Sequence, residues 1–178
     1  MPLQMVIQTD QAPDARQLAI ITEQLGRAPR GIQAVTATDG EGTPLVLRMD
    51  SLIDGKPFPT LYWLSSDRLK IELSHLEAAG VIKTLEAMLK EDPDFMAAYH
   101  KSHEDYVTRR WQSMSEAVQQ EVTKRGYAQL LRERGVGGIS NWTQVRCLHT
   151  QYAHHLCGNN VIGQWVDAHY PEVAASLP

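Results

Sequence analysis

The pattern of apolar and polar residues changes character near Ser65. Before this point, apolar residues recur at helical spacing over 14–25, and two segments rich in β-branched residues, 32–38 and 44–49, flank a glycine-rich turn. The first pattern is typical of an amphipathic helix, and the second is typical of a β-hairpin. Residues 60–64, which are rich in aromatic side chains, predict a third strand. We therefore expect one helix and a small three-stranded antiparallel sheet in this part of the chain.

After this point, the pattern predicts helices almost to the end of the chain. Apolar residues recur every three or four positions, and residues that cap or break helices separate the segments. The predicted helices cover about 66–79, 81–90, 93–111, 115–125 and 140–157, and a last helix ends at Pro171. A small sheet must bury its apolar face against other elements, so the sequence predicts an α+β fold. We expect one domain over residues 1–178, with a helix and the sheet in 14–65 and a helical part in 66–178.

Composition and charge exclude several classes of protein. Hydrophobic residues make up 43% of the 178 residues and charged residues 21%, which is ordinary for a soluble globular protein and excludes collagen-like, disordered and disulfide-stapled chains. The formal net charge of -4 argues against a general nucleic-acid-binding role. No apolar run approaches the ~20 residues of a membrane helix, and the N-terminus lacks a secretory signal pattern. We therefore expect a cytoplasmic protein whose partners include neither nucleic acid nor a membrane.

The densest group of reactive side chains lies in residues 146–157, which contain three histidines and two cysteines. If this segment is helical throughout, Cys147 and His154 share a face but lie about 10.5 Å apart along the axis, and His149 points nearly the opposite way. The two cysteines then lie about 15 Å apart, too far for a disulfide, so both are expected to be free thiols. This segment alone forms neither a four-ligand zinc site nor a Cys–His nucleophile dyad, and a metal would need ligands from elsewhere or a break in the helix.

Two features favour an anion-binding site. Arg27 and Arg30 flank a proline in a stiff polar loop, and their guanidinium groups suit a phosphate or a carboxylate. The glycine-rich loop 135–138 precedes the predicted helix over 140–157, where free backbone N–H groups favour an anion and Arg146 would add charge. A solvated loop with surface ion pairs is the alternative for the first feature, and a plain turn between helices is the alternative for the second.

Several short motifs follow one another in a characteristic order, namely residues 24–31, 54–62, 103–106, 146–149, 153–154 and 160–163. Over about residues 20–163, their order and spacing resemble those of domain-of-unknown-function family 501, a bacterial family common in actinobacteria. The resemblance implies no particular activity, although family genes often lie near those for a septum-formation initiator and an exopolyphosphatase. Family members tend to have Cys-Pro where this chain has Ser66 and Asp67, so a family metal site that used that cysteine would lack a ligand here. The Asn-Pro-x-Gly typical of the family's end is also changed, to the sequence of residues 160–163.

Our first functional interpretation is a polar pocket for a small anion that carries phosphate or carboxylate, with or without catalysis. One thiol would act as an activated nucleophile and two imidazoles would transfer protons, namely Cys147, His149 and His154. The residues expected to bind the ligand are Arg27, Arg30, Asp54, His103, Glu104, Arg146 and Asn160. This interpretation requires that Arg30 and Cys147 line the same pocket.

Two other functions stay open. The second is a zinc- or iron-binding protein, with ligands drawn from Cys147, His149, His154, His103 and Glu104. The third is a non-catalytic helical interaction module linked to cell division or envelope growth. Its apolar helix stripes would face a partner, which a second copy of the chain could supply. The sequence requires no cofactor for folding, and it does not decide whether the protein is an enzyme.

Overall fold

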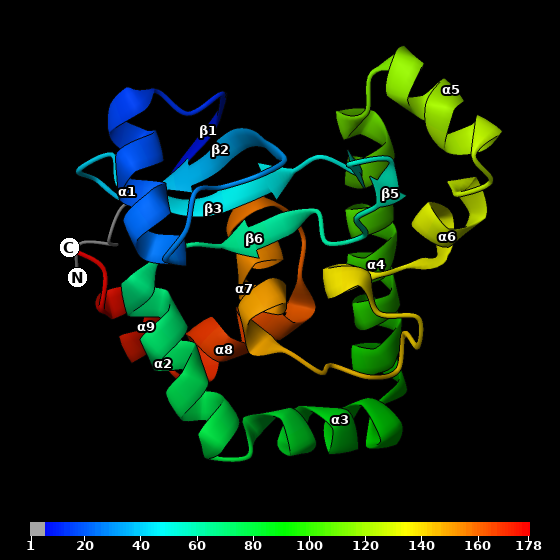
Figure 1. Ribbon diagram of the computed structural model, residues 1–178. Helices are drawn as coiled ribbons and strands as arrows, with labels where there is room; N and C mark the ends of the chain where they lie inside the picture. The colour runs from blue at the N-terminus through cyan, green and yellow to red at the C-terminus, as the bar shows by residue number, and fades with distance from the viewer. Residues whose placement is uncertain (1–5) are drawn as a thin grey trace.

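The computed structural model describes residues 6–178, and its central element is an antiparallel sheet of four strands in the order β1-β2-β3-β6 (Figure 1). The strands are β1 (Ile7–Gln11), β2 (Ile32–Thr38), β3 (Pro44–Met49) and β6 (Tyr62–Leu64). The hairpin of β2 and β3 has the expected bounds, and the Asp39 carboxylate closes its turn by accepting from the backbone N–H groups of Glu41 and Thr43. Residues 1–5, part of the segment in which we expect no secretory signal, lie outside the described residues.

The expected three-stranded sheet is corrected to four strands by β1, which pairs with β2 at the edge of the sheet. Four of its five residues are exposed, and its polar sequence lacks the apolar alternation that marks a half-buried strand. Tertiary hydrogen bonds hold it in place: Oγ1 of Thr9 donates to the carbonyl of Val35, and Nε2 of Gln8 donates to that of Leu156. This strand is therefore stabilised by backbone pairing and side-chain hydrogen bonds rather than by buried apolar side chains.

A second, smaller hairpin connects β3 to β6 and consists of β4 (Leu52–Ile53) and β5 (Lys56–Pro57). Its turn residues Asp54 and Gly55 have φ angles of 53° and 75°. Positive φ at both positions is typical of the type I′ turn, which the Asp-Gly pair favours. The backbone N–H of Phe58 donates to the Ser51 carbonyl over 2.8 Å and closes the hairpin. The proline- and glycine-containing sequence of residues 54–59 predicts a rigid loop, whereas the structure forms a defined hairpin here.

Helices pack against the sheet through two separate apolar clusters (Figure 1). The helix α1 (Ala15–Leu25) contributes Ile21 to a cluster with Val35 and Leu47. The helix α7 (Leu148–Cys157) contributes Tyr152 to the larger cluster, which includes side chains from β2, β3 and β6. The remaining helical elements are α2 (Asp67–Ala78), α3 (Val81–Glu91), α4 (Pro93–Ser113), α5 (Glu116–Lys124), α6 (Ala128–Glu133), the short 3-10 helix η1 (Val136–Gly138), α8 (Val161–His169) and α9 (Glu172–Ala175).

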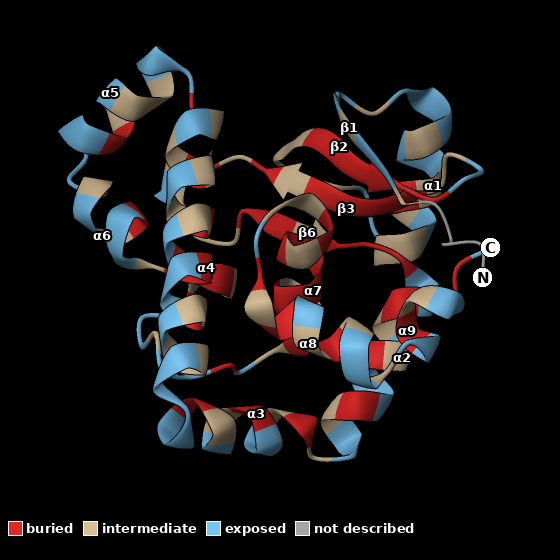
Figure 2. Cartoon of the chain, turned by 180° about the vertical axis from the view of Figure 1, so that it is seen from behind, coloured by how far each residue is buried: buried red, intermediate tan, exposed pale blue. Residues whose placement is uncertain are grey.

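Burial follows this arrangement, with α7 at the centre (Figure 2). Six of the ten residues of α7 are buried, whereas α5 has one buried residue and forms an outlying part of the molecule. The α+β class, with a small antiparallel sheet and a mainly helical C-terminal part, is confirmed. Within residues 6–178, none of the helices has the length and hydropathy needed to cross a membrane.

The helix that carries the Cys/His group is shorter than expected, because α7 begins at Leu148 rather than at residue 140. Side chains from the core bind the backbone just before it: the Tyr99 hydroxyl donates to the Gln144 carbonyl (2.7 Å), and Nε2 of Gln151 donates to the Val145 carbonyl (3.3 Å). These carbonyl groups are then satisfied without helical hydrogen bonds, which allows the segment to stay extended. The residue before α7 is therefore an N-cap rather than part of a helix face.

A buried guanidinium group joins α4 to its surroundings. Arg110 is fully buried and donates to three backbone carbonyls, those of Leu131, Arg134 and Pro59. Because these acceptors belong to α6, to the residue after it and to the loop before β6, one side chain fixes three segments against α4. Burial lowers the pKa of Arg110.

Candidate functional site

Glu77, Cys147 and His149 converge between α2 and the start of α7, and we call this group the Glu77–Cys147–His149 centre. Sγ of Cys147 lies 3.7 Å from Nδ1 of His149, and the same nitrogen lies 3.3 Å from Oε1 of Glu77. Each residue offers one ligand atom that lies within 4.8 Å of the other two. All three residues are half-buried, so the group is reachable from solvent without being fully hydrated.

The face of α2 that packs against α7 orients the His149 ring. Lys70, Ser74 and Glu77 follow one another at helical spacing on this face. Nε2 of His149 lies 3.1 Å from the Lys70 carbonyl oxygen and 3.1 Å from Oγ of Ser74. A carbonyl oxygen only accepts a hydrogen bond, so Nε2 carries a proton and Nδ1 faces Cys147 and Glu77.

The start of α7 positions the other two ligand atoms. Cys147 is the N-cap residue of this helix and has an extended backbone, with φ of -144°. Its thiol therefore lies beside the first turn of the helix. The backbone N–H of Leu148 donates to Oε2 of Glu77 over 2.9 Å, which leaves Oε1 to face His149. Two packed helices thus hold all three groups.

The contacts within the centre change the ionisation of its thiol and imidazole. Burial raises the pKa of Cys147, but hydrogen bonds from His149 and from the backbone N–H of Thr150 outweigh it and lower the pKa of the thiol below its ordinary value. The hydrogen bond with Cys147 raises the pKa of His149 above its ordinary value. Opposite shifts in two contacting groups favour a thiolate beside a positive charge. The point where the three side chains meet therefore attracts a cation, which can be a proton on Nδ1 or a metal ion.

The contact between Cys147 and His149 corrects our expectation that this segment forms no Cys–His dyad. That expectation depends on one helix over 140–157, in which the two side chains point in different directions. Because α7 begins only at Leu148, Cys147 lies outside the helix, and its thiol turns toward the ring two residues later.

Glu77 is the member of the centre that is not predicted from the sequence. It belongs to α2, far from the Cys/His group in the sequence, and its neighbours Leu76, Ala78 and Ala79 are typical of an ordinary helix end. No local motif identifies it. The only signal in the sequence is that it continues the polar face formed by Lys70 and Ser74, a pattern shared by most exposed helices.

The metal ligands expected on α4, His103 and Glu104, do not join the centre. His103 is fully buried: its Nδ1 accepts from the backbone N–H of Val136 over 3.0 Å, and its ring stacks on Trp142 with centroids 4.9 Å apart. Burial lowers the pKa of His103 to about 3, so the ring is neutral. Glu104 is exposed. The structure thus replaces this pair with Glu77 as the third candidate ligand.

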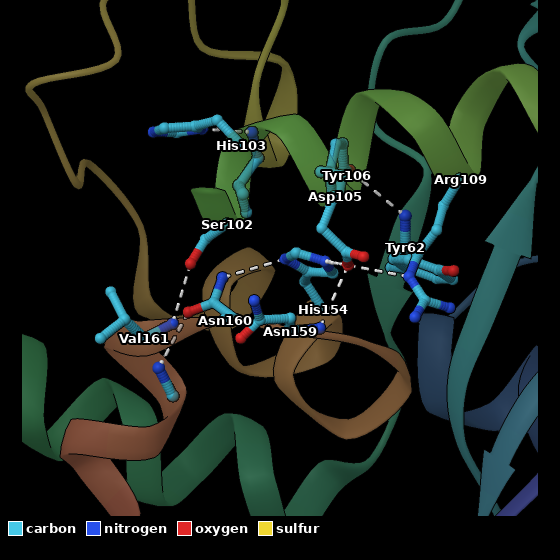
Figure 3. A network of polar contacts seen from close by, with 12 residues as sticks. Tyr62, Ser102, His103, Asp105, Tyr106, Arg109, His154, Asn159, Asn160 and Val161 are labelled. Carbon is cyan, nitrogen blue, oxygen red and sulfur yellow. Dashed lines mark hydrogen bonds and ion pairs between the residues drawn. The ribbon is translucent and has the colours of Figure 1, made fainter. Parts of the chain in front are cut away.

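His154, the third expected catalytic residue, belongs to a buried polar network (Figure 3). Its Nε2 donates to Oδ2 of Asp105 over 2.8 Å, and its Nδ1 accepts from Nδ2 of Asn160 over 3.1 Å. The same Asp105 oxygen accepts from Nε of Arg109 (2.8 Å) and from the backbone N–H of Asn159 (3.1 Å). Burial lowers the pKa of His154, so its ring is neutral and fully enclosed. These hydrogen bonds join α4 to α7 and to the start of α8.

Asn160, an expected ligand-binding residue, also serves the fold. It is the N-cap of α8 and accepts from the backbone N–H of Gly163 over 2.9 Å. Its amide donates to Oε1 of Gln151 over 2.8 Å, and its side chain is fully buried. Its polar groups are thus used within the core.

The loop that carries Arg27 and Arg30, which we call the basic loop, lies at a separate cavity of about 410 Å³, which we call the Arg27–Lys56 cavity. Arg27, Arg30 and Lys56 line it together with apolar side chains from α1, β3, β4 and β6. Asp54 forms an ion pair with Arg30. Cys147 is not among the residues that line this cavity. The sequence predicts that Arg30 and Cys147 line the same pocket, and the structure shows that this prediction is wrong.

Arg146 and the glycine-rich loop lie near the start of α7. Arg146 is exposed, has a left-handed backbone with φ of 61°, and forms no hydrogen bond or ion pair with the residues that the structure describes. The glycine-rich loop contains η1, whose Gly137 packs closely against Thr150: a side chain at this position would come within 2.6 Å of Oγ1. The loop is therefore a packing element between helices rather than the cap of α7.

Comparison with known proteins identifies a family to which the chain is similar. A family model described as "Protein of unknown function (DUF501)" matches residues 35–168. This range begins within β2 and ends within α8, so it includes β3 to β6 and α2 to α7, and it contains Glu77, Cys147 and His149. Searches of curated proteins and of solved structures gave no match. Because the family model covers most of the chain, the protein belongs to the DUF501 family.

Proposed function

We propose that the Glu77–Cys147–His149 centre binds one zinc ion through Oε1, Sγ and Nδ1, with a fourth position open to water or a substrate. Three protein ligands and one exchangeable position are typical of catalytic zinc sites, whereas structural sites use four protein ligands. The half-buried position of the three residues is consistent with an exchangeable ligand.

The spacing of the ligand atoms carries this proposal. Ligand atoms at about 2.0–2.3 Å from a tetrahedral zinc lie about 3.4 Å apart for nitrogen and oxygen, and about 3.6 Å apart for nitrogen and sulfur. The corresponding distances from Nδ1 of His149 are 3.3 Å to Oε1 of Glu77 and 3.7 Å to Sγ of Cys147. Two of the three distances between the ligand atoms therefore already match a tetrahedral zinc site, and the third, from Oε1 to Sγ, is below 4.8 Å.

The groups around the centre support the same conclusion. Histidines that bind zinc usually donate their other ring N–H to a carbonyl or carboxylate, and Nε2 of His149 faces the Lys70 carbonyl in this way. Ligating carboxylates are commonly held by a further hydrogen bond, and Glu77 accepts one from Leu148. A thiolate with an imidazole favours zinc over magnesium or calcium, which prefer oxygen ligands. Zinc at such a position lowers the pKa of a bound water to about 7, which makes hydrolysis or hydration the class of reaction to test.

Cobalt and zinc titration of the metal-free, tag-free protein tests this proposal. Co²⁺ bound by a thiolate gives a near-ultraviolet charge-transfer band, which we expect to saturate at one equivalent and to disappear when Zn²⁺ is added. Cys147→Ser is expected to abolish the band, and Glu77→Gln to weaken Co²⁺ binding at least about 10-fold. The matched control is Cys157→Ser, which removes the other cysteine of the chain and should leave the band unchanged. Absence of saturable binding, or equal effects of the two serine variants, would overturn the proposal.

A nucleophilic thiol is the second candidate function, because the pKa of Cys147 is lowered beside His149. A thiolate in contact with an imidazole at a helix start is the usual arrangement of an activated cysteine. The two functions give opposite results in one assay. Zinc protects Cys147 from iodoacetamide if the centre is a metal site, whereas alkylation at the same rate with and without Zn²⁺ supports the nucleophile.

A further inference from the structure

We propose that the Arg27–Lys56 cavity binds a small amphiphilic anion, an apolar ring or chain that carries one carboxylate or phosphate group. This site is independent of zinc binding at the Glu77–Cys147–His149 centre, because none of those three residues lines the cavity. Either proposal can therefore fail while the other holds.

The inner wall of the cavity suits an apolar ligand. The rings of Phe58 and Trp63 stack with centroids 6.3 Å apart and an interplanar angle of 19°, and both line the cavity with Leu25 and Ile53. All four are partly buried members of the cluster around Leu47, so they remain in contact with solvent at the edge of a packed core. The volume of about 410 Å³ lies within the ~300–1,000 Å³ typical of small-molecule sites.

The rim of the cavity carries an excess of positive charge. Three cations line it, and among the residues that the structure describes only Arg30 has a carboxylate partner, which is Asp54. Arg27 and Lys56 form no ion pair with any residue in 6–178. The chain as a whole has a net charge of -4, so this rim differs in sign from the average of the molecule. Unpaired cations beside an apolar wall favour a ligand with an apolar body and an anionic end.

The backbone around the cavity is already ordered. Gly31, with φ of 71°, accepts from the backbone N–H of Asp50 over 2.7 Å and anchors the end of the basic loop. A side chain at Gly31 would come within 2.4 Å of the Ile53 side chain, so the loop and the small hairpin pack closely. Pro29 restricts the loop between the two arginines. Binding therefore requires little ordering of the chain, which otherwise reduces affinity.

A matched pair of fluorescent probes tests the proposal. 8-Anilinonaphthalene-1-sulfonate carries one negative charge, and N-phenyl-1-naphthylamine has the same aromatic skeleton without that charge. We expect both to bind the full-length protein saturably, with the anionic probe bound more tightly. Trp63→Phe is expected to reduce energy transfer from tryptophan to the bound probe, because Trp63 lines the cavity. Equal affinity for the two probes, or transfer unchanged by Trp63→Phe, would overturn the proposal.

Surface-charge variants locate the anion without disturbing the core. Arg27→Gln and Lys56→Gln are each expected to weaken binding of the anionic probe about 3- to 10-fold and to leave the neutral probe unchanged. The control is Lys83→Gln, which removes an exposed cation from α3 outside the cavity. Equal weakening by Lys83→Gln would assign the effect to general charge and contradict the proposal.

Competition then distinguishes the two anionic groups. Decanoate and decyl phosphate each carry the same apolar chain, and displacement of the anionic probe by either one supports the site and identifies its preferred group. Decanol is the uncharged control. Displacement by decanol as strong as that by both anions, or displacement by none of the three, would refute an amphiphilic-anion site.

Discussion

Replacing Asp105 with alanine measures how much the buried network around His154 contributes to stability. One oxygen of Asp105 accepts from Nε2 of His154, from Nε of Arg109 and from the backbone N–H of Asn159. The His154 side chain has 0% exposure, so its donor has no access to water once the carboxylate is removed. Arg109 and Asn159 are less buried and can regain hydrogen bonds to solvent.

The expected loss follows from these contacts. A hydrogen bond to a charged group contributes about 1.5–3 kcal/mol, and a buried donor left without a partner costs about 1–3 kcal/mol. The two effects describe the same His154 bond in part, so they do not simply add. We therefore expect Asp105→Ala to lower the free energy of unfolding by about 3 kcal/mol at pH 7, measured by urea denaturation.

The pH dependence of the free energy of unfolding provides a second test of Asp105→Ala. Burial raises the pKa of Asp105, but hydrogen bonds from His154, Asn159 and Arg109 outweigh it and hold the pKa well below its ordinary value. The unfolded carboxyl titrates near pH ~4, so the stabilisation is complete above that value and is lost as the pH falls toward the folded pKa. The difference between wild type and Asp105→Ala should therefore shrink below pH ~4.

The neighbouring Glu104 provides the control. It is exposed on the same helix, so Glu104→Ala should change stability by less than about 0.5 kcal/mol. Asp105→Asn keeps an oxygen that accepts from His154 and should fall between the two. A loss below about 1 kcal/mol for Asp105→Ala, or equal losses at positions 104 and 105, would refute the reasoning.

Three further predictions follow from buried groups. Burial lowers the pKa of His103 to about 3, so between pH 7.5 and pH 5 its imidazole takes up a proton only in the unfolded chain. The free energy of unfolding in urea should therefore fall by about 2 kcal/mol over this pH range, and His103→Gln should remove that loss. Gly135→Ala would bring a Cβ within 2.2 Å of Nδ1 of His103 and should cost more than about 2 kcal/mol in the same assay, whereas Gly40→Ala, with open space around it, should cost far less. Burial raises the pKa of Cys157 to about 11, so mass spectrometry of metal-free protein after brief iodoacetamide treatment should find Cys147 modified before Cys157; the reverse order would contradict the structure.

Local sequence signals predict the parts of the fold that local interactions determine. β-Branched residues around a glycine-rich turn predict the hairpin of β2 and β3 with its observed bounds, because a turn and alternating side chains suffice to define it. The edge strand β1 is missed because its polar residues are held by pairing with β2 and by hydrogen bonds to distant carbonyls. The α+β class follows from the contrast between the two parts of the chain.

The candidate site depends more on distant contacts. Cys147 and His149 stand out in the sequence, but their pairing requires that α7 begin at Leu148, and the carbonyls before it are bound by side chains from Tyr99 and Gln151. Such tertiary hydrogen bonds leave no trace in local periodicity. Chemically active residue types also occur in the core for structural reasons. His154 illustrates this, since its imidazole is used by the buried network (Figure 3).

The positions of Glu77 and of the basic loop also depend on contacts between distant parts of the chain. Glu77 reaches the centre only because α2 packs against α7, and no motif near it indicates a ligand. Arg27 and Arg30 are polar loop residues in the sequence, and their position at this cavity follows from the close packing of the loop's end, at Gly31, against Ile53 of the small hairpin. Both arginines are predicted from the sequence to bind an anion, but in one pocket with Cys147, whereas Cys147 does not line the cavity where they lie.

Anomalous X-ray diffraction at the zinc absorption edge tests the central claim most directly. Crystals of tag-free protein prepared with one equivalent of Zn²⁺ should give one strong peak within about 2.3 Å of Oε1 of Glu77, Sγ of Cys147 and Nδ1 of His149. A map with no peak at these atoms, and with the thiol still in contact with the imidazole, would contradict a zinc centre and leave the proton on Nδ1 as the cation that the three side chains share.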